Sequence, residues 1–211
     1  MTPLDRAPVS NIAERVYRIT LNPRQQQRLQ RIRDATGTGP EFQAALDFLN
    51  AEFSLLGPAT LLELLRLPFE RRPFRPARFS DGAHPVLYTA LEWETAGQEY
   101  SYWAPTLYGD GSGTPFRVRL HLISCHFEGA TKDVRPVQAD YPWLTASTYD
   151  ECQKLGAAAK AEGLDGLLSP SARRSGGTTV PIFSQASVSQ PAEEREVIFA
   201  IEPNGSRAAF S

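Results

Sequence analysis

The segment Phe116–Phe127 (FRVRLHLISCHF) constrains the fold more than any other part of the sequence, because apolar and polar side chains alternate along it. The apolar positions are Phe116, Val118, Leu120 and Leu122, and the polar positions between them are Arg117, Arg119 and His121. Successive side chains of a strand point to opposite faces of a sheet. The alternation therefore predicts a long strand with one face against the core and the other in water, and the chain must build a sheet around it.

Shorter segments rich in β-branched and aromatic residues predict the other strands. The first, Val16–Leu21, ends at a turn formed by Asn22 and Pro23, and Arg18 projects from its middle. The others are Pro85–Ala90, Gly166–Leu168, Thr179–Phe183 and Arg195–Ile201. We expect the segments at 166–168 and 179–183 to pair, because the residues between them are rich in turn formers.

Helical patterns separate these strands. Residues 40–67 predict two helices around a Gly57-Pro58 break, residues 94–103 predict a third, and Ser147–Asp150 (STYD) predicts a capping box for a helix that ends near Gly163. Residues 66–78 contain five arginines and three prolines and predict an extended basic loop. The tail from Gly205 is expected to be frayed.

Together these elements predict an α+β fold, with a mixed β-sheet core flanked by helices. A chain of 211 residues suits a single domain over residues 1–211, with a helical elaboration at about 40–67. Lys and Arg total 22 and Asp and Glu 24, so a net charge of −2 gives no overall attraction to DNA or to an anionic membrane. No window approaches the roughly 20 apolar residues of a membrane span, and the N-terminal segment lacks the layout of a secretion signal. We therefore expect a cytoplasmic protein that binds neither DNA nor a membrane directly.

The potential metal ligands are sparse. Cys125 and Cys152 lie far apart, and His121 and His126 are spaced so that their side chains face opposite sides of a strand. Neither pair has the close spacing of a zinc site. The sequence predicts no metal site, and both cysteines are expected to be reduced, buried thiols.

The common catalytic motifs are also missing. The glycine clusters that begin at Gly37 and Gly109 do not join a strand to a helix with the spacing of a dinucleotide-binding or phosphate-binding loop. The serine elbow of the α/β-hydrolases, G-x-S-x-G, does not occur. Rossmann, P-loop and Ser-His-Asp chemistry are therefore excluded.

Single polar residues beside the predicted strands remain as candidates: Arg18, Arg78, Tyr88, Glu99 and Ser171. Each has an ordinary structural explanation. An arginine in a strand usually lies on the wet face, a tyrosine in an apolar strand usually belongs to the core, a helical glutamate usually lies on the surface, and a serine between strands usually forms a turn. Spacing alone does not choose between these explanations and a functional site.

Taken in order along the chain, however, these residues resemble the RES domain family, which is found in toxins of RES-Xre toxin–antitoxin modules. The family's early strand arginine is similar to Arg18 in VYRIT, and its G-R-[WF] element resembles Arg78 and Phe79 in ARFS, with Ala77 in place of the glycine. A tyrosine then precedes a glutamate in a T-A-x-x-E helix, as Tyr88 precedes Glu99 by eleven residues. The later P-S-A-R turn resembles the segment that holds Ser171 and Arg173. The gap between Arg18 and Arg78 is longer than in the family and holds the helices of residues 40–67.

The resemblance implies a fold similar to ADP-ribosyltransferases, with NAD+ as substrate and no further cofactor. It implies cleavage of the nicotinamide–ribose bond with phosphate or water as acceptor, and Glu99, Arg78 and Ser171 as catalytic residues. Arg18, Tyr88, Phe79 and Arg173 would bind the substrate. Glu99 would stabilise the ribosyl cation, the arginines would hold the pyrophosphate, and Tyr88 would stack on a ring of the ligand.

The resemblance also implies a partner, an Xre-type antitoxin with a helix-turn-helix domain that covers the active site. Residues 40–67 offer a surface for the antitoxin or for a homodimer, or they simply add to the core. Two alternatives to NAD+ degradation stay open at this point. The protein could transfer ADP-ribose to a macromolecule, or it could be a non-catalytic module whose basic loop binds a phosphate-bearing or acidic partner.

Overall fold

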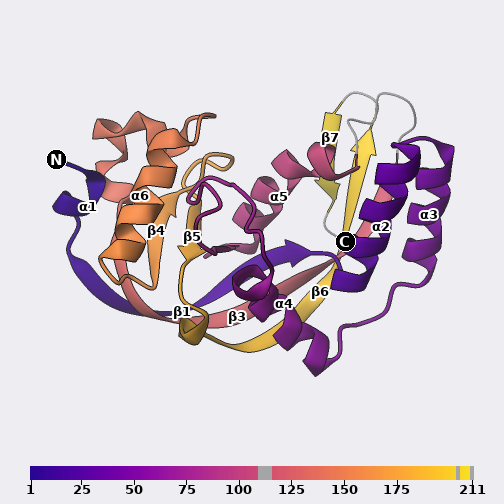
Figure 1. Ribbon diagram of the computed structural model, residues 1–211, viewed down its shortest axis with the longest axis horizontal. Coiled ribbons are helices and arrows are strands. Elements are labelled where there is room, and N and C mark those ends of the chain that lie inside the picture. Colours follow the sequence, from indigo (N-terminus) through magenta and orange to yellow (C-terminus); the bar gives the residue numbers. More distant parts are fainter. Residues whose placement is uncertain (109–115, 203–204, 210–211) are drawn as a thin grey trace.

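The computed structural model describes residues 1–108, 116–202 and 205–209, which form a mixed sheet covered by helices (Figure 1). The seven strands are β1 (Val9–Thr20), β2 (Leu87–Ala90), β3 (Phe116–Asp133), β4 (Gly166–Pro170), β5 (Thr178–Ile182), β6 (Val188–Glu202) and β7 (Gly205–Ala209). The α-helices are α1 (Pro3–Arg6), α2 (Pro23–Thr36), α3 (Pro40–Ala51), α4 (Pro58–Glu70), α5 (Trp93–Tyr108) and α6 (Asp150–Ala161). Three short 3-10 helices are η1 (Arg135–Asp140), η2 (Pro142–Thr145) and η3 (Gln185–Ser187). The α+β fold expected from the sequence is confirmed.

The sheet has the strand order β1-β2-β5-β4-β3-β6-β7, and β1 also pairs with β3. The first five strands of this order therefore close on themselves. β3 and β4 run parallel while their neighbours run antiparallel, so the sheet is mixed, as predicted. β4 and β5 form the expected antiparallel pair, whereas β1 and β6 begin several residues before the predicted strands.

The prediction of a continuous wet face for β3 is correct only at its start. Arg117 is exposed and Arg119 is half-buried, but His121 is 1% exposed. The ring of His121 stacks on Phe53 with centroids 4.5 Å apart, and its Nδ1 lies 2.6 Å from the buried carboxylate of Glu193. The segment between α3 and α4 covers this face of β3, a long-range contact that strand periodicity does not encode.

The helices divide between the two ends of the sheet (Figure 1). α6 lies beside β4 at one end, α2 and α3 pack together at the other, and α5 runs between them. The core is largely divided between the same regions: one cluster joins α2, α3 and α5 to β1, β3 and β6, and another joins α1 and α6 to β4 and η2. The two helices predicted within residues 40–67 are α3 and α4, and α5 confirms the helix predicted at 94–103.

Helix α2 was not predicted, although the sequence contains the signal for its start. The side chain of Asn22 accepts a hydrogen bond from the Arg24 N–H, and Pro23 occupies the first turn, which is the usual arrangement at a helix N-terminus. The Asn22-Pro23 pair therefore begins a helix in addition to forming the turn that ends the predicted strand. The helix is strongly polar and buries only Pro23 and Leu29, so its apolar periodicity is weak.

Three further local predictions were wrong. The basic loop begins at Arg71 rather than Arg66, because α4 continues through Pro68 to Glu70 and is anchored by buried Leu64 and Leu65. The predicted capping box at Ser147–Asp150 does not form, since Tyr149 is the N-cap of α6 and makes no capping hydrogen bond. The tail expected to fray from Gly205 instead pairs with β6 as strand β7 over residues 205–209.

The C-terminal end of α6 agrees with the sequence, because Gly163 has a φ of +78° just beyond the helix. Both cysteines are buried and unpaired, as predicted. In the part of the chain that the structure describes, no helix is long and apolar enough to cross a membrane.

Gly156 brings α6 into direct contact with the segment that carries Arg78. A Cβ at this position would lie 2.1 Å from the carbonyl oxygen of Phe79. Helix propensity alone would favour alanine over glycine by about 1 kcal/mol, but overpacking against backbone typically costs about 1–3 kcal/mol or more. We expect Gly156→Ala to lower the free energy of unfolding by about 2 kcal/mol in urea titrations.

A reverse substitution on the exposed side of the same helix provides the control. Ala158 is exposed, so Ala158→Gly should cost only the helix propensity difference of about 1 kcal/mol. If Gly156→Ala were instead more stable than the wild type, the close packing of α6 on the Phe79 backbone would be wrong.

Candidate functional site

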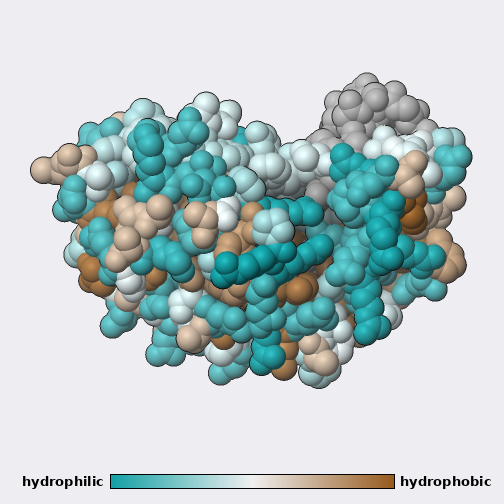
Figure 2. Space-filling view, viewed as in Figure 1, coloured by the Kyte–Doolittle hydropathy of each residue, from teal (hydrophilic) through white to brown (hydrophobic). Residues whose placement is uncertain are grey.

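Helix α5 presents one face to a cavity of about 260 Å³. Ala96, Glu99, Tyr100 and Trp103 line this cavity, and their spacing is that of a single helical face. The other walls come from the end of β1, from α2, from residues 77–79, and from β2 and β5. The space-filling view is hollowed between the part of the molecule formed around α6 and the part formed around α2 (Figure 2).

Glu99 and Ser171 are joined by a short hydrogen bond. The hydroxyl of Ser171 donates to Glu99 Oε1 at 2.6 Å and accepts from the backbone N–H groups of Arg173 and Arg174 at 3.1 and 3.0 Å. Because both N–H groups occupy acceptor positions of the hydroxyl, its proton is directed toward the carboxylate. Ser171 is 7% exposed, whereas Glu99 is half-buried and borders the cavity. The serine therefore fixes the orientation of a carboxylate whose other oxygen, Oε2, accepts no hydrogen bond from the residues that the structure describes.

The turn that carries Ser171 is tied to the start of α5 by a second set of contacts. Glu92 Oε2 accepts from the Thr178 N–H at 2.9 Å and from the Thr95 hydroxyl, and Arg174 lies 3.8 Å from the same oxygen. These contacts hold the β4–β5 connection against the helix on which Glu99 lies. Sequence reasoning missed this network, because its members are far apart in the chain and have no motif spacing.

Arg18 lines the cavity from β1 and is half-buried. None of the side-chain hydrogen bonds or ion pairs within the described residues involves its guanidinium. Burial lowers the pKa of Arg18 from its ordinary value, and nearby Cys125 and Tyr100 oppose this effect only in part. A half-buried guanidinium that faces a cavity and has no protein partner can donate to an anionic ligand bound there.

Arg78 is held more firmly. It is 8% exposed, and its Nη1 donates to the carbonyl oxygens of Leu144 and Ala146 at 3.3 and 3.0 Å. Its guanidinium lies 4.8 Å from the ring centroid of Tyr149. Within the described residues Nη2 is buried without a hydrogen-bond partner, and Arg78 borders the same cavity as Arg18 and Glu99. The side chain is thus fixed in place with one donor left over.

Tyr88 and Phe79 form the wall beside Arg78. The hydroxyl of Tyr88 accepts the Phe79 N–H at 2.9 Å, and burial raises the pKa of Tyr88 well above its ordinary value. Phe79 borders the cavity but is only 1% exposed and belongs to a core cluster. His84 further stabilises this turn, because its Nε2 lies 3.1 Å from the Phe79 carbonyl oxygen. These contacts position the backbone that holds Arg78.

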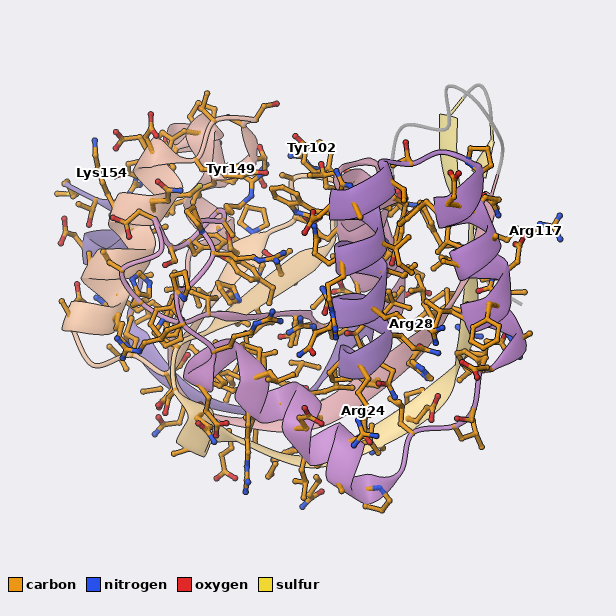
Figure 3. The ribbon with its side chains drawn as sticks, turned by 45° about the vertical axis from the view of Figure 1, so that its right-hand side comes forward. Arg24, Arg28, Tyr102, Arg117, Tyr149 and Lys154 are labelled. Atoms are coloured by element: carbon orange, nitrogen blue, oxygen red, sulfur yellow. The ribbon has the colours of Figure 1, made fainter. Side chains whose placement is uncertain are left out.

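Arg173 does not line the cavity, so its place differs from that of the other predicted residues. Its guanidinium lies 3.3 Å from the ring centroid of Tyr102 and hydrogen bonds to Tyr149. Figure 3 labels Tyr102 and Tyr149 near each other at the upper rim of the molecule. Nε and Nη2 of Arg173 are buried without partners within the described residues. Arg173 therefore reaches the site through its backbone N–H, which donates to Ser171.

Five of the seven predicted site residues, Arg18, Arg78, Phe79, Tyr88 and Glu99, border one cavity, and Ser171 joins them through Glu99. Sequence reasoning missed Tyr100, Trp103 and the contribution of α2. The spacing of Trp103 from Glu99, four residues along a helix, is a signal that could have identified Trp103. In the part of the chain that the structure describes, no group of three or more His, Cys, Asp or Glu side chains could hold a metal ion.

Comparison with known proteins gives the family of the chain. A solved structure that the chain resembles is a chain of the M. tuberculosis MbcT–MbcA toxin–antitoxin complex, with 16% identity, a TM-score of 0.49, and coverage of 90% of this chain and 88% of that one. No curated protein matches the sequence. The model of the RES domain family matches residues 63–202, a range that includes Arg78, Tyr88, Glu99 and Ser171 but not Arg18. The chain belongs to the RES domain family.

Proposed function

We propose that the protein is a toxin-like enzyme that degrades NAD+ by cleaving the nicotinamide–ribose bond, with phosphate or water as the acceptor. It would arrest growth unless an antitoxin neutralises it. The observation that carries this proposal is the Ser171–Glu99 hydrogen bond of 2.6 Å, at a cavity that is also lined by Arg18 and Arg78.

The charges at this cavity match those of NAD+. The two arginines offer donors to a pyrophosphate, and a guanidinium can hold a phosphate through two parallel hydrogen bonds. The single carboxylate suits the opposite end of the ligand, where positive charge develops on the ribose. Two cations and one anion in the cavity favour a ligand of net negative charge, which NAD+ has despite its cationic ring.

The reaction requires one carboxylate rather than two. When the bond between ribose C1′ and the nicotinamide nitrogen breaks, the electron pair goes to the cationic ring and releases neutral nicotinamide. No general acid is needed for the leaving group, unlike the two-carboxylate hydrolysis of ordinary glycosides. Glu99 would stabilise the oxocarbenium-like transition state, and the acceptor oxygen would then bond to C1′.

Product analysis tests this proposal directly. The purified protein is incubated with NAD+ with and without inorganic phosphate, and nicotinamide and the ribosyl products are quantified. ADP-ribose 1-phosphate that forms only with phosphate indicates phosphorolysis, and ADP-ribose alone indicates hydrolysis. If NAD+ stays intact under all conditions while the protein is folded, the proposal is wrong.

Transfer of ADP-ribose to a macromolecule is a second candidate, favoured by one observation. Arg71, Arg72 and Arg75 are exposed in the basic loop that leads to Arg78, and they offer a docking surface close to the cavity. Radiolabel retained on protein or nucleic acid would identify this activity. Salt-sensitive binding of a partner without loss of NAD+ would instead identify a non-catalytic module.

The proposed partner is an Xre-type antitoxin with a helix-turn-helix domain, as the family resemblance implies. Helices α3 and α4 offer a surface for this partner or for a second copy of the chain. Expression of the protein alone should arrest growth of the host, and co-expression of the antitoxin should restore it.

A further inference from the structure

The cavity has a second end to which the proposed function assigns no role. We define the α2 end of the cavity by Leu21, just beyond β1, by Gln26, Leu29 and Gln30 of α2, and by Tyr108 of α5, all of which line it. Helix α2 lies outside the range matched by the RES family model, residues 63–202. This end of the cavity is therefore built partly by an element beyond the matched domain.

The chemistry of the α2 end differs from that around Glu99. Leu21, Leu29 and Tyr108 are between 2% and 7% exposed and belong to one core cluster, so they form an apolar wall. None of the five residues that define this end is charged. An apolar pocket with a few polar groups that fix orientation is typical of a site for a flat, neutral ring.

The polar groups at this end are two amides on one helical face. Gln26 and Gln30 are four residues apart in α2, and an amide offers both a donor and an acceptor. Gln30 Nε2 donates to Asp34 at 2.7 Å, and its amide oxygen remains available as an acceptor. Paired amide donors and acceptors complement the amino group and ring nitrogen of adenine, as in the amide–adenine pairing of nucleic-acid recognition.

The distance along β1 fits a nucleotide. Arg18 lies near the end of β1 and Leu21 lies just beyond it, and three residues of extended chain span about 10 Å. A phosphate at the Arg18 guanidinium would therefore lie about one sugar away from a base at the α2 end. We propose that the α2 end of the cavity binds the adenine base of NAD+, an inference that rests on the proposed function and names the subsite of its second base.

Binding of fragments tests this subsite without requiring catalysis. AMP and ribose 5-phosphate share a sugar and a phosphate, but only AMP carries the base. Isothermal titration calorimetry should give an affinity for AMP at least tenfold higher than for ribose 5-phosphate. The Gln26→Ala/Gln30→Ala variant should lose about tenfold in AMP affinity, as expected for two hydrogen bonds, and should bind ribose 5-phosphate unchanged.

Gln27 supplies the matched control, because it is exposed on the same helix and does not line the cavity. Gln27→Ala should bind AMP like the wild type. All three substitutions introduce alanine into a helix at positions that are exposed or half-buried, so the fold is kept.

Two outcomes would overturn the adenine site: equal affinity for AMP and ribose 5-phosphate, or an AMP affinity that the double substitution leaves unchanged.

In the cleavage assay, the double variant should raise the KM for NAD+ about tenfold but leave the KM for nicotinamide mononucleotide unchanged. If neither compound is cleaved while AMP binding follows the expected pattern, the base site stands and the proposed reaction fails.

Discussion

Replacement of Glu99 by glutamine is expected to slow nicotinamide release from NAD+ by about 10²–10³-fold. Glutamine has nearly the same volume and its carbonyl oxygen can still accept the Ser171 hydroxyl, so the fold and the hydrogen bond are kept. The substitution removes only the negative charge that would face the ribosyl cation. The loss should therefore appear in kcat rather than in KM, because the cation develops after the substrate is bound.

Two further variants distinguish the effect of the Glu99 charge from the effects of another glutamate on α5 and of the serine that orients Glu99. Glu94 lies on the same helix but does not line the cavity, so Glu94→Gln should keep the wild-type rate. Ser171→Ala removes the donor that orients the carboxylate, and we expect an intermediate loss of about tenfold in kcat. Full turnover by a normally folded Glu99→Gln protein would contradict the assignment of Glu99 as the catalytic carboxylate.

The growth phenotype gives the same comparison in cells. If NAD+ cleavage causes arrest, expression of the Glu99→Gln variant should leave the host growing, whereas expression of Glu94→Gln should arrest it like the wild type. Equal arrest by both variants would show that toxicity does not depend on the carboxylate.

The strands and helices with strong local patterns were predictable from the sequence. The alternation of β3, the apolar run of β2 and the pattern of α5 each determine an element through contacts between neighbouring residues. Helix α2 and strand β7 were not predictable in this way. The first has a polar surface with a single buried leucine, and the second forms only because β6 offers its edge.

The candidate site was identified by the order of its residues along the chain, not by their spacing. Ser171 and Glu99 are 72 residues apart, and their contact depends on the β4–β5 connection and on the Glu92 network. The same holds for Arg173. Its side chain was predicted to bind the substrate, but Arg173 does not line the cavity and instead supports Ser171 through its backbone N–H. Local patterns place a residue on an element, but the tertiary packing decides which face of that element borders the cavity.

Arg18 connects stability with ligand binding, because its guanidinium is half-buried in the cavity wall and none of the hydrogen bonds or ion pairs within the described residues involves it. The penalty for removing an ion from water amounts to several kcal/mol when no partner offsets it. Arg18→Met keeps an unbranched side chain and removes the charge. We therefore expect this variant to be more stable than the wild type without ligand, by about 1–2 kcal/mol.

The same substitution should weaken NAD+ binding. A charge-assisted hydrogen bond contributes about 1.5–3 kcal/mol, so the KM for NAD+ should rise by about 10- to 100-fold. ADP-ribose should raise the melting temperature of the wild type more than that of Arg18→Met, because at the same ligand concentration a tighter ligand stabilises the native state more. Thermal unfolding with and without ADP-ribose measures both effects in one experiment.

Arg15 lies on the same strand and provides the matched control. It is exposed and pairs with Glu194 at 2.9 Å at the surface, and an ion pair of this kind contributes at most about 1 kcal/mol. Arg15→Met should therefore change neither the KM nor the ligand-induced shift in melting temperature. If Arg18→Met proved less stable than the wild type without ligand, the guanidinium would be part of the packed core. A gain in stability together with a loss of affinity would instead mean that β1 holds an unfavourable cation in the cavity because the ligand requires it.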